Sequence, residues 1–522
     1  MINLLQEADV AIIGGGLAAM EAALAVSGAN PEAKVVLLSK KPVGLSGASL
    51  VALSVHRYAP QEPGLREDYG RSFLASSQGV GDPALLEILM DEGAAALKGL
   101  EELGLPLESK ELPASDGKMY RYLSCCRPKY GRRLTEPMRE LLLSRPRVRE
   151  EAGYMAVELL TRNGAVCGVL AEQEGRFYVQ PAKAVILASG GAGFVYENTS
   201  NTRDLTGDGY GLALRAGLAL QDMEFVQFYP YRIASPGRAN IFPDVFDHGA
   251  VFLNEKGERF MAGFPKKEQE NRDVLARRMF AQKEVVFDIS GADQEYIKNE
   301  CSAVYDLARK YHTQQFLMKP VAHFMMGGIP LQADGGSSLP GLYCCGEVTG
   351  GLHGANRIAG SALTECAVFG ARAGRAAAAY VREKAGNEAA GAEGSAELAS
   401  QAARIVQSFC PQPGQEDTRP IIAALRKTMW EKASLIRSEA SLKEAKTVVA
   451  ALTGQLKSQR PASLRLWLEA GNLLLTAEAI VDSALLRQES RGAHFREDYP
   501  AADPAMAGNV IYRQGRAEFI KR

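Results

Sequence analysis

The sequence predicts an α/β fold in which strands of a parallel sheet alternate with helices, followed by a helical domain. Three observations support this prediction. An apolar run at 8–13, a glycine turn with a helical pattern, and a second apolar run at 34–40 form a strand–helix–strand unit. Two more apolar runs, at 184–189 and 341–346, also end at glycine. Residues 400–488 instead carry apolar side chains at helical spacing.

The chain divides into parts of different character. The stretch 223–322 has mixed patterning and lies between two of the strands that end at glycine, so we expect an inserted domain there. Residues 384–400 are rich in Ala, Gly, Glu and Ser, which predicts a solvated linker. A last strand is expected within 509–519. The first predicted domain consists of two segments, 1–222 and 323–383, with the insertion 223–322 between them. The linker 384–400, a helical domain at 401–490 and a C-terminal segment at 491–522 follow.

Composition and charge exclude several classes of protein. The 60 Lys and Arg residues balance 61 Asp and Glu residues, which excludes a nucleic-acid binder that works by bulk positive charge. With 46% hydrophobic residues the chain is not intrinsically disordered. Because no apolar run reaches about 18 residues, no membrane span is expected. The N-terminus lacks the features of a signal peptide, so we expect a cytoplasmic protein that reaches a membrane only through a partner.

The first glycine turn is the main candidate for a cofactor site. It has the spacing G-x-G-x-x-A, follows a strand and opens a helix, where backbone N–H groups can approach a pyrophosphate. A tight turn without a ligand is the alternative. The second strand ends in Ser39-Lys40 and not in the acid that usually binds an NAD ribose, which argues against NAD. The small residues from Pro42 to Ser54 suit a backbone that follows a bulky cofactor, or a flexible loop.

Nine motifs occur in one order along the chain: 189–193, 206–209, 221–224, 257–260, 271–274, 323–328, 346–347, 353–357 and 489–494. With this set the chain resembles the flavoprotein subunit of succinate dehydrogenase and fumarate reductase, and its relative L-aspartate oxidase, over nearly its whole length. The resemblance implies a Rossmann-like FAD-binding domain with an inserted α+β capping domain and a C-terminal helical domain, at the boundaries given above.

The resemblance also implies which residues contact FAD. Glu347 suits this role physically, because a carboxylate at a strand end can accept hydrogen bonds from ribose or ribityl hydroxyls. Respiratory members of the family carry a histidine near Ser46 that bonds covalently to the flavin; none occupies that place here, and His56 comes later. The resemblance therefore implies non-covalent FAD, contacted by Gly14, Gly15, Gly16, Ala18, Ala19, Ser39, Lys40, Ser46, Gly47, Ala48, Gly190, Asp208, Glu347, Ala362 and Leu363.

Three residues match the reacting centre of the family. Arg272 matches the arginine that donates the proton, a role that rests on the resemblance because arginine normally stays protonated. His323 and Arg357 match the pair that binds one substrate carboxylate, and arginine binds carboxylates bidentately. The alternatives are an Arg–Asp pair at a helix start for Arg272 and a core histidine for His323. His353 is expected either to orient these residues or to be structural.

The other end of the predicted substrate pocket departs from the family. Residues 227–232 read Gln-Phe-Tyr-Pro-Tyr-Arg where respiratory members carry Gln-Phe-His-Pro-Thr-Gly, and the family's Thr-Glu-Gly-x-Arg-Gly stretch is missing at 242–248. Tyr229 is expected to donate a hydrogen bond to the substrate as a neutral group. The pocket would then suit an unsaturated acid whose second end is neutral, aromatic or bulkier. Alternatively, one of three residues replaces the missing group: Arg232, His248 or Lys256.

The sequence thus predicts an FAD-dependent oxidoreductase that acts on CH–CH groups and interconverts an unsaturated carboxylate and its saturated form. The cysteines show no iron–sulfur or haem spacing and no metal site is expected, so the electrons require a separate partner, an iron–sulfur or other electron-carrier subunit. The rival hypotheses are an L-aspartate oxidase-like enzyme and a flavin electron-relay subunit without carboxylate chemistry. Structural roles are expected for Cys344-Cys345 in a buried strand, for Cys125-Cys126 in a solvated loop, and for residues 490–498.

Overall fold

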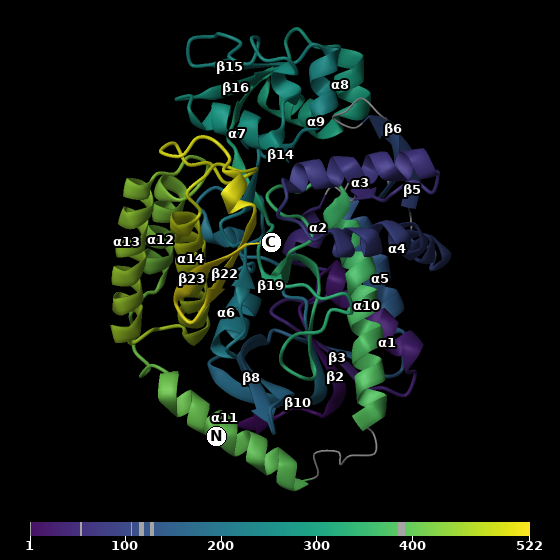
Figure 1. The fold of residues 1–522 in the computed structure, drawn as a ribbon, viewed down its shortest axis with the longest axis vertical. Coiled ribbons are helices and arrows are strands. Elements are labelled where there is room, and N and C mark those ends of the chain that lie inside the picture. Colours follow the sequence, from purple (N-terminus) through teal and green to yellow (C-terminus); the bar gives the residue numbers. More distant parts are fainter. Residues whose placement is uncertain are drawn as a thin grey trace.

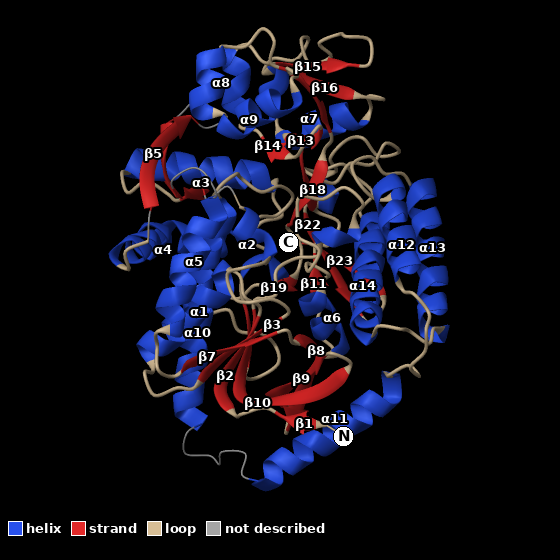
Figure 2. Cartoon of the chain, turned by 180° about the vertical axis from the view of Figure 1, so that it is seen from behind, coloured by secondary structure: helices blue, strands red, loops and turns tan. Residues whose placement is uncertain are grey.

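An eight-stranded sheet forms the base of the molecule (Figures 1 and 2). The computed structural model describes residues 2–52, 55–105, 107–113, 119–125, 130–384 and 392–521, so Ser54 and Cys126 of the predicted segments lie outside it. The strands run in the order β7-β3-β2-β10-β9-β8, and β1 and β20 also pair with β10. Their bounds are β1 Asn3–Leu4, β2 Ala8–Ile13, β3 Val35–Ser39, β7 Val148–Ala152, β8 Met155–Arg162, β9 Ala165–Gln173, β10 Arg176–Leu187 and β20 Leu342–Cys344.

Strand β10 joins two kinds of sheet. Its first half pairs antiparallel with β9, and its second half pairs parallel with β2 and β20. The parallel strands β3, β2, β10 and β20 therefore end at one edge, and each glycine turn predicted from the sequence follows one of these ends. Ligands of open α/β sheets bind outside the carboxyl ends of the strands, so this edge is where a site is expected.

Helices cover both faces of the parallel part. Val10 and Ile12 of β2 share a core with α1 and α10, whereas Ala11 and Ile13 share a core with α6 and α14, as side chains alternate along a strand. In α10, Gly374 allows close packing, since an added Cβ would lie 2.3 Å from the Ala22 carbonyl oxygen of α1. The helices of these layers are α1 Leu17–Ala29, α2 Gly47–Val51, α3 Pro63–Ser77, α4 Pro83–Glu102, α5 Tyr130–Leu143, α6 Asp208–Arg215 and α10 Ser361–Lys384.

A capping unit lies above the edge of the sheet, at the top of Figure 1. It is a five-stranded antiparallel sheet of order β14-β13-β17-β16-β15 with an aromatic core, and all its elements fall within the predicted insertion 223–322. The pair β12 and β18 connects it to the base. The bounds are β12 Val226–Tyr229, β13 Arg232–Ser235, β14 Ala239–Asn240, β15 Val251–Asn254, α7 Arg272–Phe280, β16 Val285–Asp288, α8 Gln294–Glu300, α9 Ser302–Tyr311, β17 Gln315–Met318 and β18 Val321–Met325.

The helical domain begins earlier than predicted, so the linker prediction for 384–400 is wrong in extent. Helix α11 starts at Ala392, inside that stretch, because its Ala and Glu residues favour helix and because Leu398 and Ala402 are buried against the sheet. The remaining helices are α12 Arg419–Lys432, α13 Glu439–Ser458 and α14 Leu464–Leu486, after α11 Ala392–Phe409. Among the described residues no helix is long and apolar enough to cross a membrane.

The C-terminal segment forms a hairpin instead of the single predicted strand. Its two strands turn at Gln514-Gly515, both with positive φ, and the first strand pairs with β11. The smaller elements are β11 Leu220–Gln221, β22 Gly508–Arg513 and β23 Arg516–Lys521, the sheet of β4 Val55–Arg57, β5 Leu107–Pro113 and β6 Met119–Cys125, and the pair β19 Ile329–Pro330 and β21 Thr349–Gly350.

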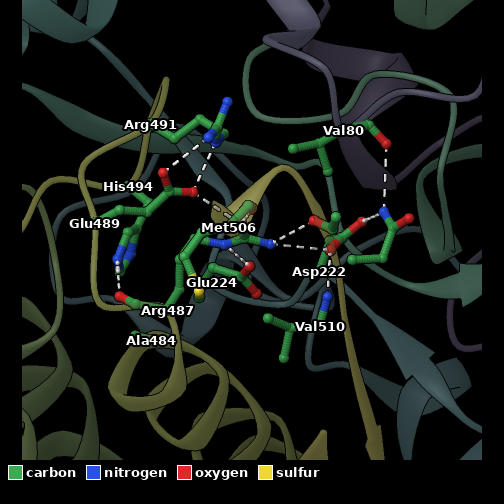
Figure 3. A network of polar contacts seen from close by, with 12 residues as sticks. Val80, Asp222, Glu224, Ala484, Arg487, Glu489, Arg491, His494, Met506 and Val510 are labelled. Atoms are coloured by element: carbon green, nitrogen blue, oxygen red, sulfur yellow. Dashed lines mark hydrogen bonds and ion pairs between the residues drawn. The ribbon is translucent and has the colours of Figure 1, made fainter. Parts of the chain in front are cut away.

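A buried network of charges ties the C-terminal segment to the rest of the chain (Figure 3). Arg487 is fully buried and pairs with Glu224 at 2.5 Å and with Glu489 at 3.0 Å. Arg491 pairs with the same Glu489 and also donates to the carbonyl of Gln78. Within the predicted stretch 490–498, Arg491 reaches a distant part of the chain by a hydrogen bond to Gln78, whereas the ion pair with distant Glu224 is made by Arg487, just before that stretch.

Candidate active site

One large cavity of about 470 Å³ lies where the strand ends meet the capping unit. A cavity of this size is typical of small-molecule sites. Every predicted site residue lines it except Ala19, which points into the core behind α1. Residues that the sequence analysis did not single out also line it, among them Ser49, Tyr154, Ser200, Asn201, Asn240 and Phe324.

The lower part of the cavity is a cradle of backbone around the first glycine turn. Gly14 has φ +128°, and an added Cβ would lie 2.2 Å from the carbonyl oxygen of Ala188, so only glycine fits. Gly16 caps α1 without a side chain, which leaves the positive end of the helix dipole facing the cavity. Ser189 adds a buried hydroxyl with no partner in the described chain. These features fit a dinucleotide that carries a pyrophosphate.

Lys40 and Asp208 line this lower part as an ion pair. The Lys40 Nζ lies 2.9 Å from Asp208 and 2.9 Å from Glu469 of α14. Burial alone would lower the pKa of Lys40, but the two ion pairs outweigh burial and raise it. The charges predicted to meet the cofactor thus neutralise each other. The contribution of Glu469 had no local signal in the sequence, because it comes from the helical domain.

Glu347 lies at the end of β20 with a carboxylate in the cavity wall. Its Oε1 accepts a hydrogen bond of 3.0 Å from the amide of Met325, and burial raises the pKa of Glu347 to about 7. An added Cβ at Gly191 would lie 2.5 Å from this oxygen, so glycine is required beside it. A carboxyl group placed in this way can bind hydroxyl groups of a cofactor.

Arg272 is the first residue of α7 and enters the cavity from the capping unit. Its guanidinium lies 5.2 Å from the ring centroid of Tyr229 and has no carboxylate partner in the described part of the chain. The alternative of an Arg–Asp pair fails, since Asp273 instead pairs with Arg277 at 3.0 Å. Arg272 is therefore free to meet an anion.

Arg357 lies opposite, in the loop before α10, and is almost fully buried. Its Nη2 donates to the Gln227 side chain at 2.8 Å, and its Nε is buried with no partner in the described chain. Phe324 supports the guanidinium at 4.5 Å. Burial, followed by Arg272, lowers the pKa of Arg357 to about 9, so the group is still cationic at neutral pH.

His323 lies on β18 between Ser200 and Tyr229. Its Nδ1 is 2.8 Å from the Ser200 hydroxyl, and its ring stacks on Tyr229 at 5.0 Å. Burial, followed by the neighbouring arginines, holds the pKa of His323 well below its ordinary value, so the ring is neutral. A neutral imidazole beside two guanidinium groups can act as a hydrogen-bond donor or acceptor to an anion but adds no charge.

His353 does not reach the cavity. It pairs with Glu365 at 2.8 Å, stacks on Phe73 and packs edge-on against Phe324, the ring beneath Arg357. Of the two roles expected for it, the structural one fits this arrangement. Cys344 and Cys345 are buried, as expected for packing, and the part of the chain that the structure describes contains no group of metal ligands.

Two predictions need correction at the end of the pocket where the sequence differs from the family's motifs. The Tyr229 hydroxyl donates to the carbonyl of Ile241 at 2.8 Å, so the hydrogen bond predicted for the substrate is used within the capping unit. His248 stacks on Tyr296 at 3.5 Å and, like Lys256, does not line the cavity. Of the three suggested replacements only Arg232 does.

Comparison with known proteins agrees with this geometry. A family model described as an FAD binding domain matches residues 9–363, and one described as the C-terminal part of fumarate reductase flavoproteins matches 422–514. The chain is 30% identical to a subunit of the fumarate reductase (CoM/CoB) from Methanothermobacter marburgensis, over 99% of both chains. The chain belongs to the succinate dehydrogenase/fumarate reductase flavoprotein family. Like that family, it is an FAD-dependent oxidoreductase with an α/β fold.

Relatives with different names are similarly close. The chain is 33% identical to an L-aspartate oxidase of Caulobacter vibrioides, over 97% of this chain and 96% of that one. Its structure matches the FrdA chain of E. coli quinol fumarate reductase with a TM-score of 0.88 and 25% identity, over 99% and 97% of the two chains. The family therefore establishes the cofactor FAD and the class of oxidoreductase, and its members carry the names of different enzymes, fumarate reductase and L-aspartate oxidase.

Proposed function

We propose that this flavoprotein binds FAD non-covalently and interconverts an unsaturated carboxylate and its saturated form. The observation that carries the proposal is the placement of Arg272, without a carboxylate partner in the described chain, in one cavity with Arg357, His323 and the glycine cradle. Non-covalent binding is supported by the cavity wall at Ser46, where the sequence has no histidine, and by His56, which is buried outside the cavity.

The carboxylate of the substrate binds to Arg357 and His323. Gln227 holds one nitrogen of the Arg357 guanidinium, and the unpartnered Nε leaves a donor for a carboxylate oxygen. The neutral His323 adds a hydrogen bond from its other ring nitrogen. Cationic donors on this carboxylate withdraw electrons from the adjacent double bond and so polarise it.

Arg272 moves the proton at the carbon next to the site of hydride exchange. Bound FAD supplies or accepts the hydride. In the direction of reduction Arg272 gives one proton to the substrate and regains one from solvent, and in the reverse direction it removes the proton. Its position over Tyr229 keeps the guanidinium directed into the cavity, and burial of the capping unit's aromatic core excludes water on that side.

Electrons enter or leave through a second protein in this proposal. The sequence holds no spacing of cysteines for an iron–sulfur cluster or haem, and the Methanothermobacter relative is named as a subunit. An L-aspartate oxidase activity is the second candidate, favoured by the 33% identity to the Caulobacter enzyme. A pure electron relay is disfavoured, because a relay does not need the carboxylate-binding residues Arg357 and His323.

Replacement of Arg272 tests the proposal. Single-turnover reoxidation of the reduced flavin by an unsaturated acid should slow by about 10²- to 10⁴-fold in Arg272→Gln, the usual contribution of a positioned proton donor. FAD content should remain unchanged. Arg278→Gln, on an exposed position of the same helix, should behave as the wild type. Equal rates in the Arg272 variant and the wild type would overturn the role of Arg272.

A further inference from the structure

Ser200 lies beside His323 in the cavity wall and has no part in the reaction described above. It belongs to a loop that runs along β18. The amide of Ala322 donates to the carbonyl of Asn198 at 2.9 Å, and the amide of Ser200 donates to the carbonyl of Ala322 at 2.9 Å. The side chain of Asn201 adds a hydrogen bond of 3.0 Å to the carbonyl of His323. These bonds hold the Ser200 hydroxyl next to the imidazole, with its Oγ 2.8 Å from Nδ1.

The neutral state of His323 makes the position of its single ring proton important. Burial, followed by the neighbouring arginines, holds the pKa of His323 far below its ordinary value, so one ring nitrogen carries a proton and the other can only accept. Nδ1 faces Ser200, whereas Nε2 has no hydrogen-bond partner in the described chain. A protonated Nε2 donates a hydrogen bond to a carboxylate, but an unprotonated Nε2 presents a lone pair to it and repels it. The tautomer therefore determines whether His323 assists or opposes the binding of an acid.

The hydrogen bonds around Ser200 show which way its hydroxyl group points. The hydroxyl has one proton and two acceptors within reach, Nδ1 of His323 at 2.8 Å and the carbonyl oxygen of Ala322 at 3.2 Å. That carbonyl already accepts hydrogen bonds from the Ser200 amide at 2.9 Å and from the Thr199 hydroxyl at 3.0 Å, which occupy its two lone pairs. The Ser200 hydroxyl is therefore directed to Nδ1, the closer acceptor. Because Nδ1 accepts, the ring proton lies on Nε2.

We propose that Ser200 is a positioning residue, whose hydroxyl donates a hydrogen bond to Nδ1 of His323 and so keeps Nε2–H as the donor to the carboxylate of the substrate. The inference rests on the proposed function for the presence of that carboxylate, but the assignment of the tautomer does not depend on it. Arg357 supplies the positive charge for the carboxylate. His323 supplies an uncharged donor, whose ring is oriented by Ser200 on one side and by stacking on Tyr229 on the other.

The tautomer of His323 can be measured directly, by nitrogen NMR of isotopically labelled histidine side chains in the oxidised holoenzyme. The sequence has six histidines, and His323→Gln identifies the signals of His323 by their loss. In the wild type we expect a protonated Nε2 and an unprotonated Nδ1 that accepts a hydrogen bond. In Ser200→Ala the Nδ1 signal should move to the position of a nitrogen without a hydrogen-bond partner, and Ser200→Thr, which keeps the hydroxyl, should restore it. A protonated Nδ1 in the wild type would overturn the inference, because Ser200 would then be the acceptor.

Binding of an acid provides a second measurement. The affinity of the oxidised holoenzyme for fumarate, followed by the flavin absorbance, should fall about 3- to 12-fold in Ser200→Ala, the usual effect of losing one hydrogen bond, and should recover in Ser200→Thr. The control is Thr202→Val in the same loop. The Thr202 hydroxyl is buried without a partner in the described chain and does not line the cavity, so this variant should bind fumarate as the wild type does.

The two measurements separate this inference from the proposed function. Equal losses of affinity in Ser200→Ala and Thr202→Val would overturn the role of Ser200. If the reduced flavin is reoxidised by no acid, while Nε2 is protonated and the Nδ1 signal depends on Ser200, the proposed function fails and the hydrogen bond from Ser200 to His323 stands. If acids are reduced but Nδ1 carries the proton, the proposed function stands and the role of Ser200 fails.

Discussion

The hydrogen bond from Arg357 to Gln227 offers a sharp test of how the first carboxylate binds. Gln227→Glu keeps the shape of the side chain and places a carboxylate where the amide oxygen now lies, 2.8 Å from the Arg357 Nη2. A substrate carboxylate on the far side of this guanidinium would lie about 6 Å away, as each hydrogen bond spans about 3 Å. At an effective dielectric constant of about 20, two negative charges at that distance repel by about 3 kcal/mol.

This repulsion corresponds to a loss of affinity of about 100-fold. The dissociation constant of fumarate should be measured by the change in flavin absorbance of the oxidised holoenzyme. Gln227→Leu serves as the neutral control and should lose only about 10-fold, because it removes the hydrogen bonds of Gln227 with Arg357 and Asn356 without adding charge. Lower pH should restore affinity in Gln227→Glu as the new carboxylate becomes protonated. Undiminished binding in Gln227→Glu, or equal losses in the two variants, would refute the placement of the carboxylate on Arg357.

Three further predictions concern the cofactor site and the stability of the fold. Gly14→Ala should be purified without FAD, because its Cβ would lie 2.2 Å from the carbonyl oxygen of Ala188, and the flavin absorbance of the purified protein checks this. Burial raises the pKa of Glu21 to about 8, so the folded state holds a proton that the unfolded state releases above about pH 4.5. The free energy of unfolding of the wild type should therefore fall by up to about 5 kcal/mol between about pH 4.5 and about pH 8. In Glu21→Gln this decrease should be absent when thermal melting is measured across the same pH range. Parallel pH profiles for the two proteins would contradict the buried, protonated state of Glu21. Glu489→Gln should destabilise the fold by about 3–5 kcal/mol, because it leaves the fully buried Arg487 short of one counter-charge, and a melting temperature equal to that of the wild type would show that the network tolerates the loss.

Local patterns explain how much of the fold could be predicted. The apolar runs at 8–13 and 34–40 correspond almost residue for residue to β2 (Ala8–Ile13) and β3 (Val35–Ser39). Strands buried on both faces are continuous apolar runs in the sequence, and a glycine turn shows where the first of them ends. The linker prediction failed because a stretch of small residues can also form a helix when a few of its side chains are buried. Here Leu398 and Ala402 pack against residues of the sheet that are far away in the sequence.

For the site, too, residues within local sequence motifs could be predicted, whereas contacts that depend on the path of the chain could not. The motifs singled out Arg272, His323 and Arg357, and all three line one cavity, although Arg272 begins α7, His323 lies in the middle of β18 and Arg357 lies in the loop before α10. The bond from Tyr229 to Ile241 could not be predicted, since it depends on the path of the hairpin that joins β13 and β14. For the same reason the sequence left three candidates for a replacement of the missing group, and of these only Arg232 lines the cavity.

The most direct test of the proposed reaction is the reoxidation of the reduced flavin under anaerobic conditions. Chemically reduced holoenzyme should be mixed in a stopped-flow instrument with fumarate, glutaconate, crotonate and 2-pentenoate, and the return of the flavin absorbance should be followed. We predict rapid and stoichiometric reoxidation by at least one of these unsaturated acids, with formation of the saturated acid. Reoxidation by oxygen or a protein partner alone, with no acid reduced, would contradict carboxylate chemistry at this site.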